Sequence, residues 1–141
     1  MDIAQVIEQY HSANDAFATG DPAPYKALYA RSEDVLLANP FGGSSRGWTA
    51  VSQAMDFASS NFREGKPVQF EEITRYSGTD LVTLFEYEHW ETKVGGRSEL
   101  APFDLRVTTT FRLEGDEWKV VSRHADPLTT SHPDGPLRPT S

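Results

Sequence analysis

Cysteine is absent from this chain of 141 residues, and so are long apolar runs. Without cysteine the protein can form neither disulfides nor a thiol nucleophile, which fits a reducing compartment and leads us to expect the cytoplasm. No stretch approaches the ~20 apolar residues that cross a bilayer. The first residues also lack the basic and apolar regions of a secretory signal. We therefore expect no membrane partner.

Basic residues are also scarce, because 13 Lys and Arg stand against 21 Asp and Glu, a net charge of −8. Each phosphate contact of a nucleic-acid-binding protein needs a lysine or arginine, so this balance argues against DNA or RNA as a partner. The sequence has no phosphate-binding loop, dinucleotide fingerprint, Gly-x-Ser-x-Gly elbow or His-Glu-x-x-His motif. We expect no nucleic acid, no cofactor and no bound metal.

Aromatic residues, in contrast, make up 11% of the chain. Together with the length, they suit one domain with a substantial core, which we assign to residues 1–130. Residues 131–141 contain three prolines and no core pattern. We expect them to form a mobile tail.

The first half of the chain has helical periodicity. A capping-box pattern at Asp2 starts a helix that apolar spacing carries to Gly20. An Asp-Pro start signal opens a second, short helix at residues 21–29. Residues 35–38 are typical of a short strand, and a third helix is predicted from about residue 49 to residue 65.

The second half is predicted to be strands, because it is rich in Val, Thr, Phe, Tyr and Trp. The predicted strands are Val68 to Tyr76, Leu81 to Lys93, Leu100 to Leu113 and Trp118 to Arg123. Two of them exceed the usual five or six residues, and strands of such length must twist and coil. The element order and the long strands predict an α+β domain, a curved, mostly antiparallel sheet with three N-terminal helices packed in its concave face.

The last predicted strand ends in ionisable side chains, Arg123, His124 and Asp126. Successive strand residues face opposite sides, so Arg123 and His124 cannot both face the core. We favour His124 as the residue facing a pocket, with Asp126 on the same face to orient its imidazole. A β-bulge within the strand would reverse this choice and make Arg123 the anion-binding group.

Several short motifs resemble, in order, the SnoaL-like and ketosteroid-isomerase-like proteins of the nuclear transport factor 2 superfamily. They are Thr19-Gly20-Asp21, Asn39-Pro40-Phe41-Gly42, Arg46-Gly47, Arg106-Val107-Thr108 and the segment from Trp118 to His124. The resemblance covers roughly residues 3–128. It implies a cone-shaped barrel with a pocket between sheet and helices, and a homodimer formed through the sheet.

The resemblance does not carry over the ketosteroid isomerase mechanism. Where those enzymes have a catalytic aspartate this sequence has Asn39, whose amide cannot take a proton near neutral pH. Their oxyanion tyrosine would fall near Ala13, with Tyr10 only a loose substitute. Their second oxyanion donor would fall at residues 107–109, where no carboxylic acid stands.

The candidate catalytic residues are therefore His124, Asp126 and Asn39. Asn39 either hydrogen-bonds a substrate carbonyl or only stabilises the turn before Pro40. The candidate substrate-binding residues are Arg123, Trp48, Met55, His89 and Trp90. We expect a pocket protein for a small apolar, carbonyl-bearing compound, acting as a cofactor-independent isomerase-, dehydratase- or cyclase-like enzyme. The alternative is a non-catalytic ligand-binding or dimeric assembly module of the same fold.

Overall fold

The structure is a computed structural model that describes residues 1–137. Its elements are α1 (Ile3–Ala18), α2 (Ala23–Leu28), β1 (Leu36–Ala38), β2 (Ser45–Arg46), α3 (Trp48–Ser60), β3 (Phe62–Arg63), β4 (Gln69–Ser77), β5 (Leu81–Val94), β6 (Ala101–Glu114) and β7 (Glu117–Pro127). The expected tail at residues 131–141 lies partly beyond the described residues. In the described part of the chain, no helix is long and apolar enough to cross a membrane.

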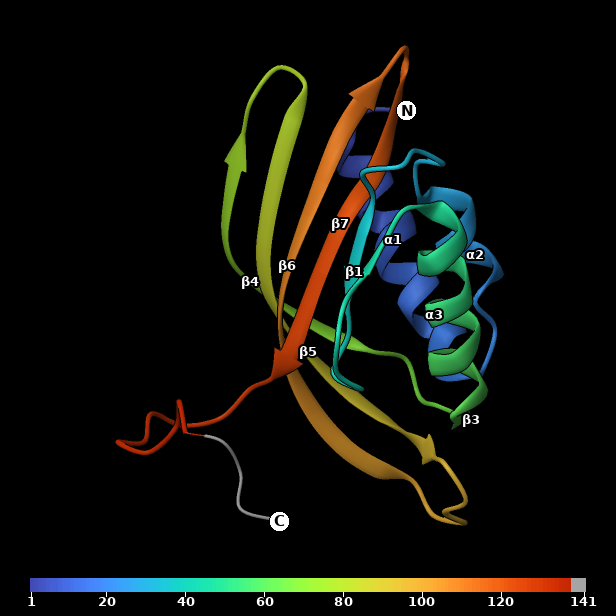
Figure 1. The fold of residues 1–141 in the computed structure, drawn as a ribbon, viewed down its shortest axis with the longest axis vertical. Coiled ribbons are helices and arrows are strands. Elements are labelled where there is room, and N and C mark those ends of the chain that lie inside the picture. The colour runs from blue at the N-terminus through green and yellow to red at the C-terminus, as the bar shows by residue number, and fades with distance from the viewer. Residues whose placement is uncertain (138–141) are drawn as a thin grey trace.

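Two long antiparallel strands, β5 and β6, form the centre of the sheet. They pair continuously from Leu81 opposite Arg112 to Thr92 opposite Ala101. The sheet runs in the order β2-β1-β7-β6-β5-β3, and β4 also pairs with β5. Among these strands, every pairing except that of β1 with β7 is antiparallel. Figure 1 shows β5 and β6 curling strongly along their length, as their length predicts.

The three helices lie together on one side of the curled sheet (Figure 1). α1 begins at the predicted capping box, in which Gln5 N–H donates to Asp2 and the Gln5 side chain accepts from Asp2 N–H. At the end of α1, Gly20 has φ +98°, and a Cβ there would lie 2.7 Å from the carbonyl oxygen of Phe62. The helix therefore passes close to β3 only because this residue is glycine. The predicted α+β fold is confirmed.

The inner face of the sheet is apolar because apolar and polar residues alternate along β6. In β6, Leu105, Val107 and Phe111 are buried against the helices, while Asp104 and Arg106 are exposed on the outer face. Burying an apolar side chain of this size contributes about 1.5–3 kcal/mol. This burial fixes the strand register, because a slip of one residue would turn the apolar set to solvent.

A β-bulge in β7 decides which of its ionisable residues faces inward. Thr110 pairs with Ser122 but Phe111 pairs with Val120, so Val121 has no partner in β6. Val120 and Val121 are both buried, and the alternation is reversed beyond them. Arg123 consequently points into the core and His124 to the outer face. The preference for an inward His124 is therefore wrong, and the bulge that would reverse it is present.

Candidate functional site

A cavity of about 30 Å³ lies between the helices and the concave face of the sheet. Its walls are mainly apolar, from helices, the loop after β1 and the strands, and include Phe17, Phe41, Met55, Phe62, Trp90 and Phe103. The polar residues that line it are Asn39, Tyr25 and Arg123. The volume is about that of one water molecule in the liquid. Any larger ligand requires a wall to move.

Arg123 is the only charged side chain among the described residues that line this cavity. Its Nη1 donates to Glu88 Oε2 at 2.8 Å, and its Nη2 donates to Glu88 Oε1 at 2.7 Å. Both side chains are buried, with 5% of the Arg123 side chain and none of the Glu88 side chain exposed. Burial alone would lower the pKa of Arg123, but the Glu88 carboxylate, together with Tyr10 and Tyr25, outweighs burial, so the pKa is raised well above its usual value. The guanidinium stays charged.

Hydrogen bonds from neighbouring buried side chains hold this ion pair in place. Arg123 Nη1 also donates to the Tyr10 hydroxyl, which is 2.7 Å from Thr109 Oγ1. The indole Nε1–H of Trp90 donates to Glu88 Oε1 at 2.9 Å. Burial raises the pKa of Tyr10 to about 12. The Tyr10 hydroxyl therefore keeps its proton at neutral pH, and it supports Arg123 rather than lining the cavity.

Tyr25, which does line the cavity, is fixed in a similar way. Its hydroxyl donates to Asn14 Oδ1, and Asn14 Nδ2 donates to the carbonyl oxygen of Tyr10. Burial raises the pKa of Tyr25 well above its usual value. The hydroxyl stays protonated near neutral pH and cannot act there as a general base.

A second buried carboxylate, Glu86, lies two residues before Glu88 on the same face of β5. His11 Nε2 is 2.9 and 3.0 Å from its two oxygens. The His11 ring also stacks on Phe70, with a centroid distance of 3.7 Å. Glu86 makes its hydrogen bonds with His11 and not with Arg123, so this pair is separate from the ion pair of Arg123 and Glu88.

Four of the residues predicted from the sequence meet at the cavity: Arg123, Asn39, Met55 and Trp90. The Asn39 Oδ1 accepts a hydrogen bond from the Phe41 N–H at 3.1 Å, so the residue does stabilise the turn. Its Nδ2 donates to no partner within residues 1–137. Both functions considered for Asn39 are thus compatible with its position.

The predicted catalytic pair is not at the cavity. His124 Nε2 is 3.0 Å from Asp126 Oδ2, but 58% and 45% of these side chains are exposed on the outer face. His89 also faces outward, where its Nδ1 is 2.7 Å from Asp104. Trp48 begins α3 at the surface, stacked under Arg31. The four residues line no part of the cavity, and no group of three potential metal ligands occurs among the described residues.

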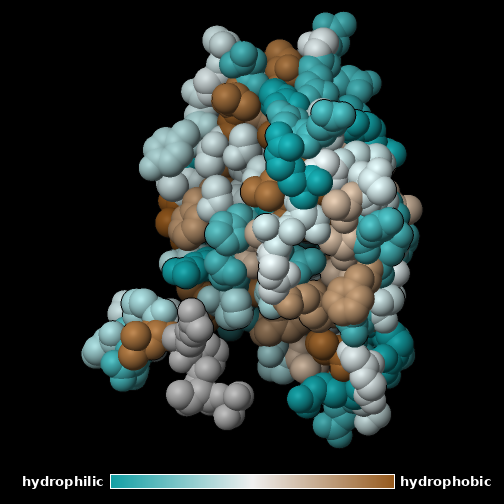
Figure 2. Space-filling view, viewed as in Figure 1, coloured by the Kyte–Doolittle hydropathy of each residue, from teal (hydrophilic) through white to brown (hydrophobic). Residues whose placement is uncertain are grey.

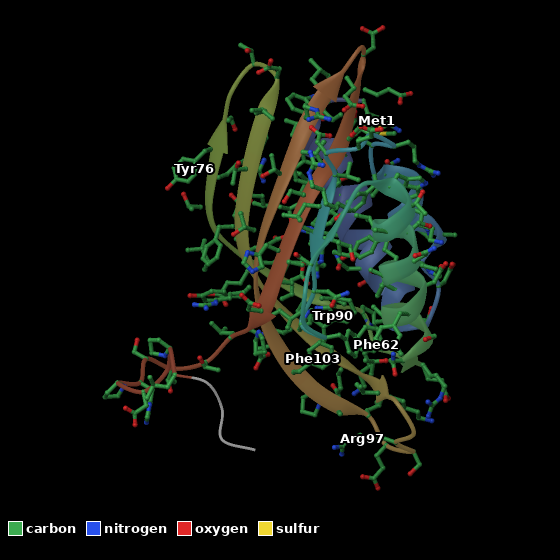
Figure 3. The ribbon with its side chains drawn as sticks, in the orientation of Figure 1. Met1, Phe62, Tyr76, Trp90, Arg97 and Phe103 are labelled. Carbon is green, nitrogen blue, oxygen red and sulfur yellow. The ribbon has the colours of Figure 1, made fainter. Side chains whose placement is uncertain are left out.

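A second, more open hollow of about 200 Å³ adjoins the cavity. Both hollows are lined by Pro40, Phe41, Phe62, Phe103 and Leu105. Figure 3 shows Phe62, Trp90 and Phe103 gathered where the helices meet the sheet, and their ring centroids are 5.6–5.8 Å apart. Phe41 stands at the boundary and is 41% exposed.

The surface around this boundary is apolar. Phe41 packs edge-on against Phe57 of α3, with a centroid distance of 5.6 Å, and Phe57 is also exposed. Figure 2 shows apolar side chains gathered over the lower part of α3. The loop continues through Gly42 and Gly43, both at positive φ and with free space around them.

A curled antiparallel sheet with helices in its concave face and a cavity between them defines a protein of the nuclear transport factor 2 class. The chain belongs to the SnoaL-like domain family, whose model matches residues 3–129. This confirms the resemblance seen in the sequence. A comparison with curated proteins gives no match.

Solved structures of low sequence identity share the fold. A candidate dehydratase of the NTF2-like family from Streptomyces avermitilis is 18% identical over 92% of this chain and 98% of its own, with a TM-score of 0.74. A ketosteroid isomerase-like protein from Erwinia carotovora atroseptica is 12% identical over 91% and 97%, with a TM-score of 0.74. An NTF2-like superfamily protein from Salmonella enterica is 14% identical over 93% and 92%, also with a TM-score of 0.74.

Proposed function

We propose that the protein binds a small, largely apolar, carbonyl-bearing molecule, with Arg123 and Asn39 as the hydrogen-bonding groups. The unused donors of Arg123 carry this proposal. A guanidinium has five N–H groups, and only three of them, two on Nη1 and one on Nη2, have partners among residues 1–137. The Nε–H and the second Nη2–H remain for an acceptor on a ligand.

Ligand binding requires Phe41 to move, because the inner cavity of about 30 Å³ holds only about one water molecule. Phe41 lines both hollows, so its displacement joins the inner cavity to the outer one of about 200 Å³. The Gly42-Gly43 segment next to it, which has open space around both residues, allows that movement. The carbonyl group then reaches Arg123, and the apolar part of the ligand lies against Phe62 and Phe103.

Binding without turnover is the function we favour over isomerase-, dehydratase- or cyclase-like catalysis. Among the described residues that line the inner cavity, none is a carboxylate or an imidazole that could carry a proton. The outer hollow adds the carboxylate of Asp104, which is exposed and paired with His89. Glu88 is occupied by Arg123 and Trp90. Catalysis in the cavity would need a base that the lining residues do not supply.

Calorimetric titration with 2-acetylnaphthalene, an uncharged aromatic ketone, tests the proposal. We expect the wild-type protein to bind it and Arg123→Lys to bind it roughly tenfold more weakly, because lysine keeps the charge but loses the fork of N–H donors. His124→Gln is the matched control, since it changes the neighbouring residue on the outer face and should leave the affinity unchanged. Absence of binding, or equal binding by Arg123→Lys, would overturn the proposal.

Steroid isomerisation gives a second test, directed at Asn39. We expect no detectable conversion of 3-oxo-Δ5 steroids in a direct absorbance assay, because loss of a positioned general base costs roughly 10²- to 10⁴-fold in rate. Asn39→Asp places a carboxylate at the cavity wall and should introduce weak activity. Rapid turnover by the unmodified protein would show that another residue carries the proton.

A further inference from the structure

Glu88, which does not line the cavity, neutralises the charge of Arg123, which does. Glu88 binds both terminal nitrogens of Arg123 and is itself completely buried. Trp90 Nε1–H and Tyr10 complete the surroundings of the pair with neutral groups. The cavity therefore presents hydrogen-bond donors to a ligand without presenting a net positive charge.

We propose that Glu88 is a specificity-determining residue, which makes the site accept uncharged carbonyl compounds and reject carboxylates of the same shape. This inference rests on the proposed function, and it defines the class of ligand more narrowly. It assigns a role to a buried residue that does not line the cavity and acts only through Arg123.

Electrostatics in a site of low dielectric explains the selection. A carboxylate ligand would bring a second negative charge to a guanidinium whose charge Glu88 already balances, and two carboxylates that share one cation repel each other. The apolar walls formed by Phe62, Phe103 and Leu105 cannot solvate the excess charge. A ketone oxygen accepts from the free N–H groups of Arg123 and adds no charge. It therefore binds without this penalty.

The test compares 2-acetylnaphthalene with 2-naphthoate, which differ only in a methyl group replaced by a charged oxygen. We expect the wild-type protein to bind the ketone at least roughly tenfold more tightly than the carboxylate. In Glu88→Gln, which keeps the shape but removes the charge, the preference should reverse. Glu86→Gln is the matched control, because it removes the other buried carboxylate of β5, which pairs with His11 and not with Arg123. It should keep the wild-type preference.

The outcomes separate this inference from the proposed function. If the wild-type protein does not bind the ketone, the proposed function fails. If it binds the ketone and Glu88→Gln leaves the ratio of the two affinities unchanged, the role of Glu88 is overturned while the proposed function stands. An equal reversal in Glu86→Gln would also overturn it, because total charge and not the ion pair would then set the preference.

A second variant covers the case in which Glu88→Gln does not fold. Asn39→Lys adds a cation to the lining of the cavity and leaves the pair of Arg123 and Glu88 intact. We expect it to bind 2-naphthoate at least roughly tenfold more tightly than the wild-type protein does. Gln53→Lys adds the same charge on the exposed side of α3 and should have no effect. An unchanged affinity in Asn39→Lys would overturn the inference.

Discussion

Ionisable residues are buried on the inner face of the sheet and exposed on the outer face, even where they are adjacent in the chain. Glu88 and Arg123 form a buried pair on the inner face, with an N–O distance of 2.7 Å. Their chain neighbours pair on the outer face, His89 with Asp104 at 2.7 Å and His124 with Asp126 at 3.0 Å. The distances hardly differ, but the exposure does.

Burial decides what each pair contributes. An exposed ion pair is screened by water and typically contributes 0–1 kcal/mol. A buried pair makes each partner indispensable, because loss of one leaves the other charged and unsolvated. On the inner face, removal of either charge destabilises the fold and the cavity that Arg123 lines. On the outer face, charged residues can be replaced with little loss of folding stability.

The largest difference between the faces should appear on removal of one partner from β7. We expect Arg123→Leu to lower the free energy of unfolding by about 3–5 kcal/mol, because Glu88 stays buried without its cation. His124→Leu, one residue further along, should change it by less than about 0.5 kcal/mol. Urea denaturation followed by circular dichroism measures both values, and equal losses would contradict the comparison.

The double variant Glu88→Leu with Arg123→Leu sharpens this result. It removes both charges at once and should be markedly more stable than Arg123→Leu alone, because no unpaired charge remains in the core. If the double variant is no more stable than the single one, lost packing and not the unpaired carboxylate causes the destabilisation.

The next largest effect on stability is expected at alkaline pH, where the buried tyrosines of the inner side ionise. Burial raises the pKa of Tyr10 to about 12 and also raises those of Tyr25 and Tyr29. In the unfolded chain tyrosine ionises near pH ~10, so the stability that these hydroxyls contribute is complete below that pH and is lost as the pH rises through the folded-state values. We expect cooperative unfolding above about pH 10.

Tyrosinate absorbance recorded alongside circular dichroism checks this expectation. The buried tyrosines should ionise together with unfolding, and the native protein should lag behind the urea-denatured chain over the same pH range. If all tyrosines ionise while the fold remains intact, the core around Arg123 is open to water.

The regular parts of the fold could be predicted because local signals agree with the packing. The capping box at Asp2 and the long strands occur where they were expected, and the apolar residues Leu105, Val107 and Phe111 of one predicted strand all face inward. The short strands β2 and β3 were missed, because two residues carry no periodicity of their own. They form only by pairing with β1 and β5.

The candidate site could be predicted only in part, because it depends on one bulge. Val120 and Val121 are adjacent, apolar and both buried, which is the signal of a bulge, but adjacent valines also occur in regular strands. Glu88 was missed because its charge suggests an exposed face. It shares strand parity with the buried Leu84 and Trp90, and this parity was the information that could have placed it inside.

We also expect the homodimer to form through the outer face, and a substitution there should have a moderate effect, which is seen in dimer affinity. Phe85 and Tyr87 lie side by side on β5, with ring centroids 5.9 Å apart, next to the threonines of β6. Light scattering at micromolar concentration should give twice the chain mass of 15.7 kDa.

Tyr87→Lys should weaken the dimer roughly tenfold or more, because two copies would bring like charges together across the two-fold axis. Gln53→Lys on α3 should leave the mass unchanged. A monomer mass for the wild-type protein would remove the dimer and leave the outer face as solvated surface.

The smallest effect is expected for the pair of His89 and Asp104, whose contribution to folding stability depends on pH. The hydrogen bond to Asp104 raises the pKa of His89 against the opposing effect of burial, and Glu71 raises it further. The sign follows from that direction: stabilisation is complete below the unfolded value of about 6.5 and is lost as the pH rises through the folded value. It should stay below about 1 kcal/mol, because the side chains are 39% and 55% exposed.

NMR titration of the His89 ring protons in wild-type protein and in Asp104→Asn measures the pair directly. We expect a lower pKa in Asp104→Asn, because the strongest hydrogen bond to the imidazolium is weakened when an amide replaces the carboxylate. Asp126→Asn is the control, since Asp126 pairs with His124 and not with His89. Arg123 stays charged throughout this pH range, so any change in stability that Asp104 controls belongs to the outer face. If the titration of His89 is the same with and without Asp104, the outer pair does not persist in solution, and only the buried pair is a fixed part of the structure.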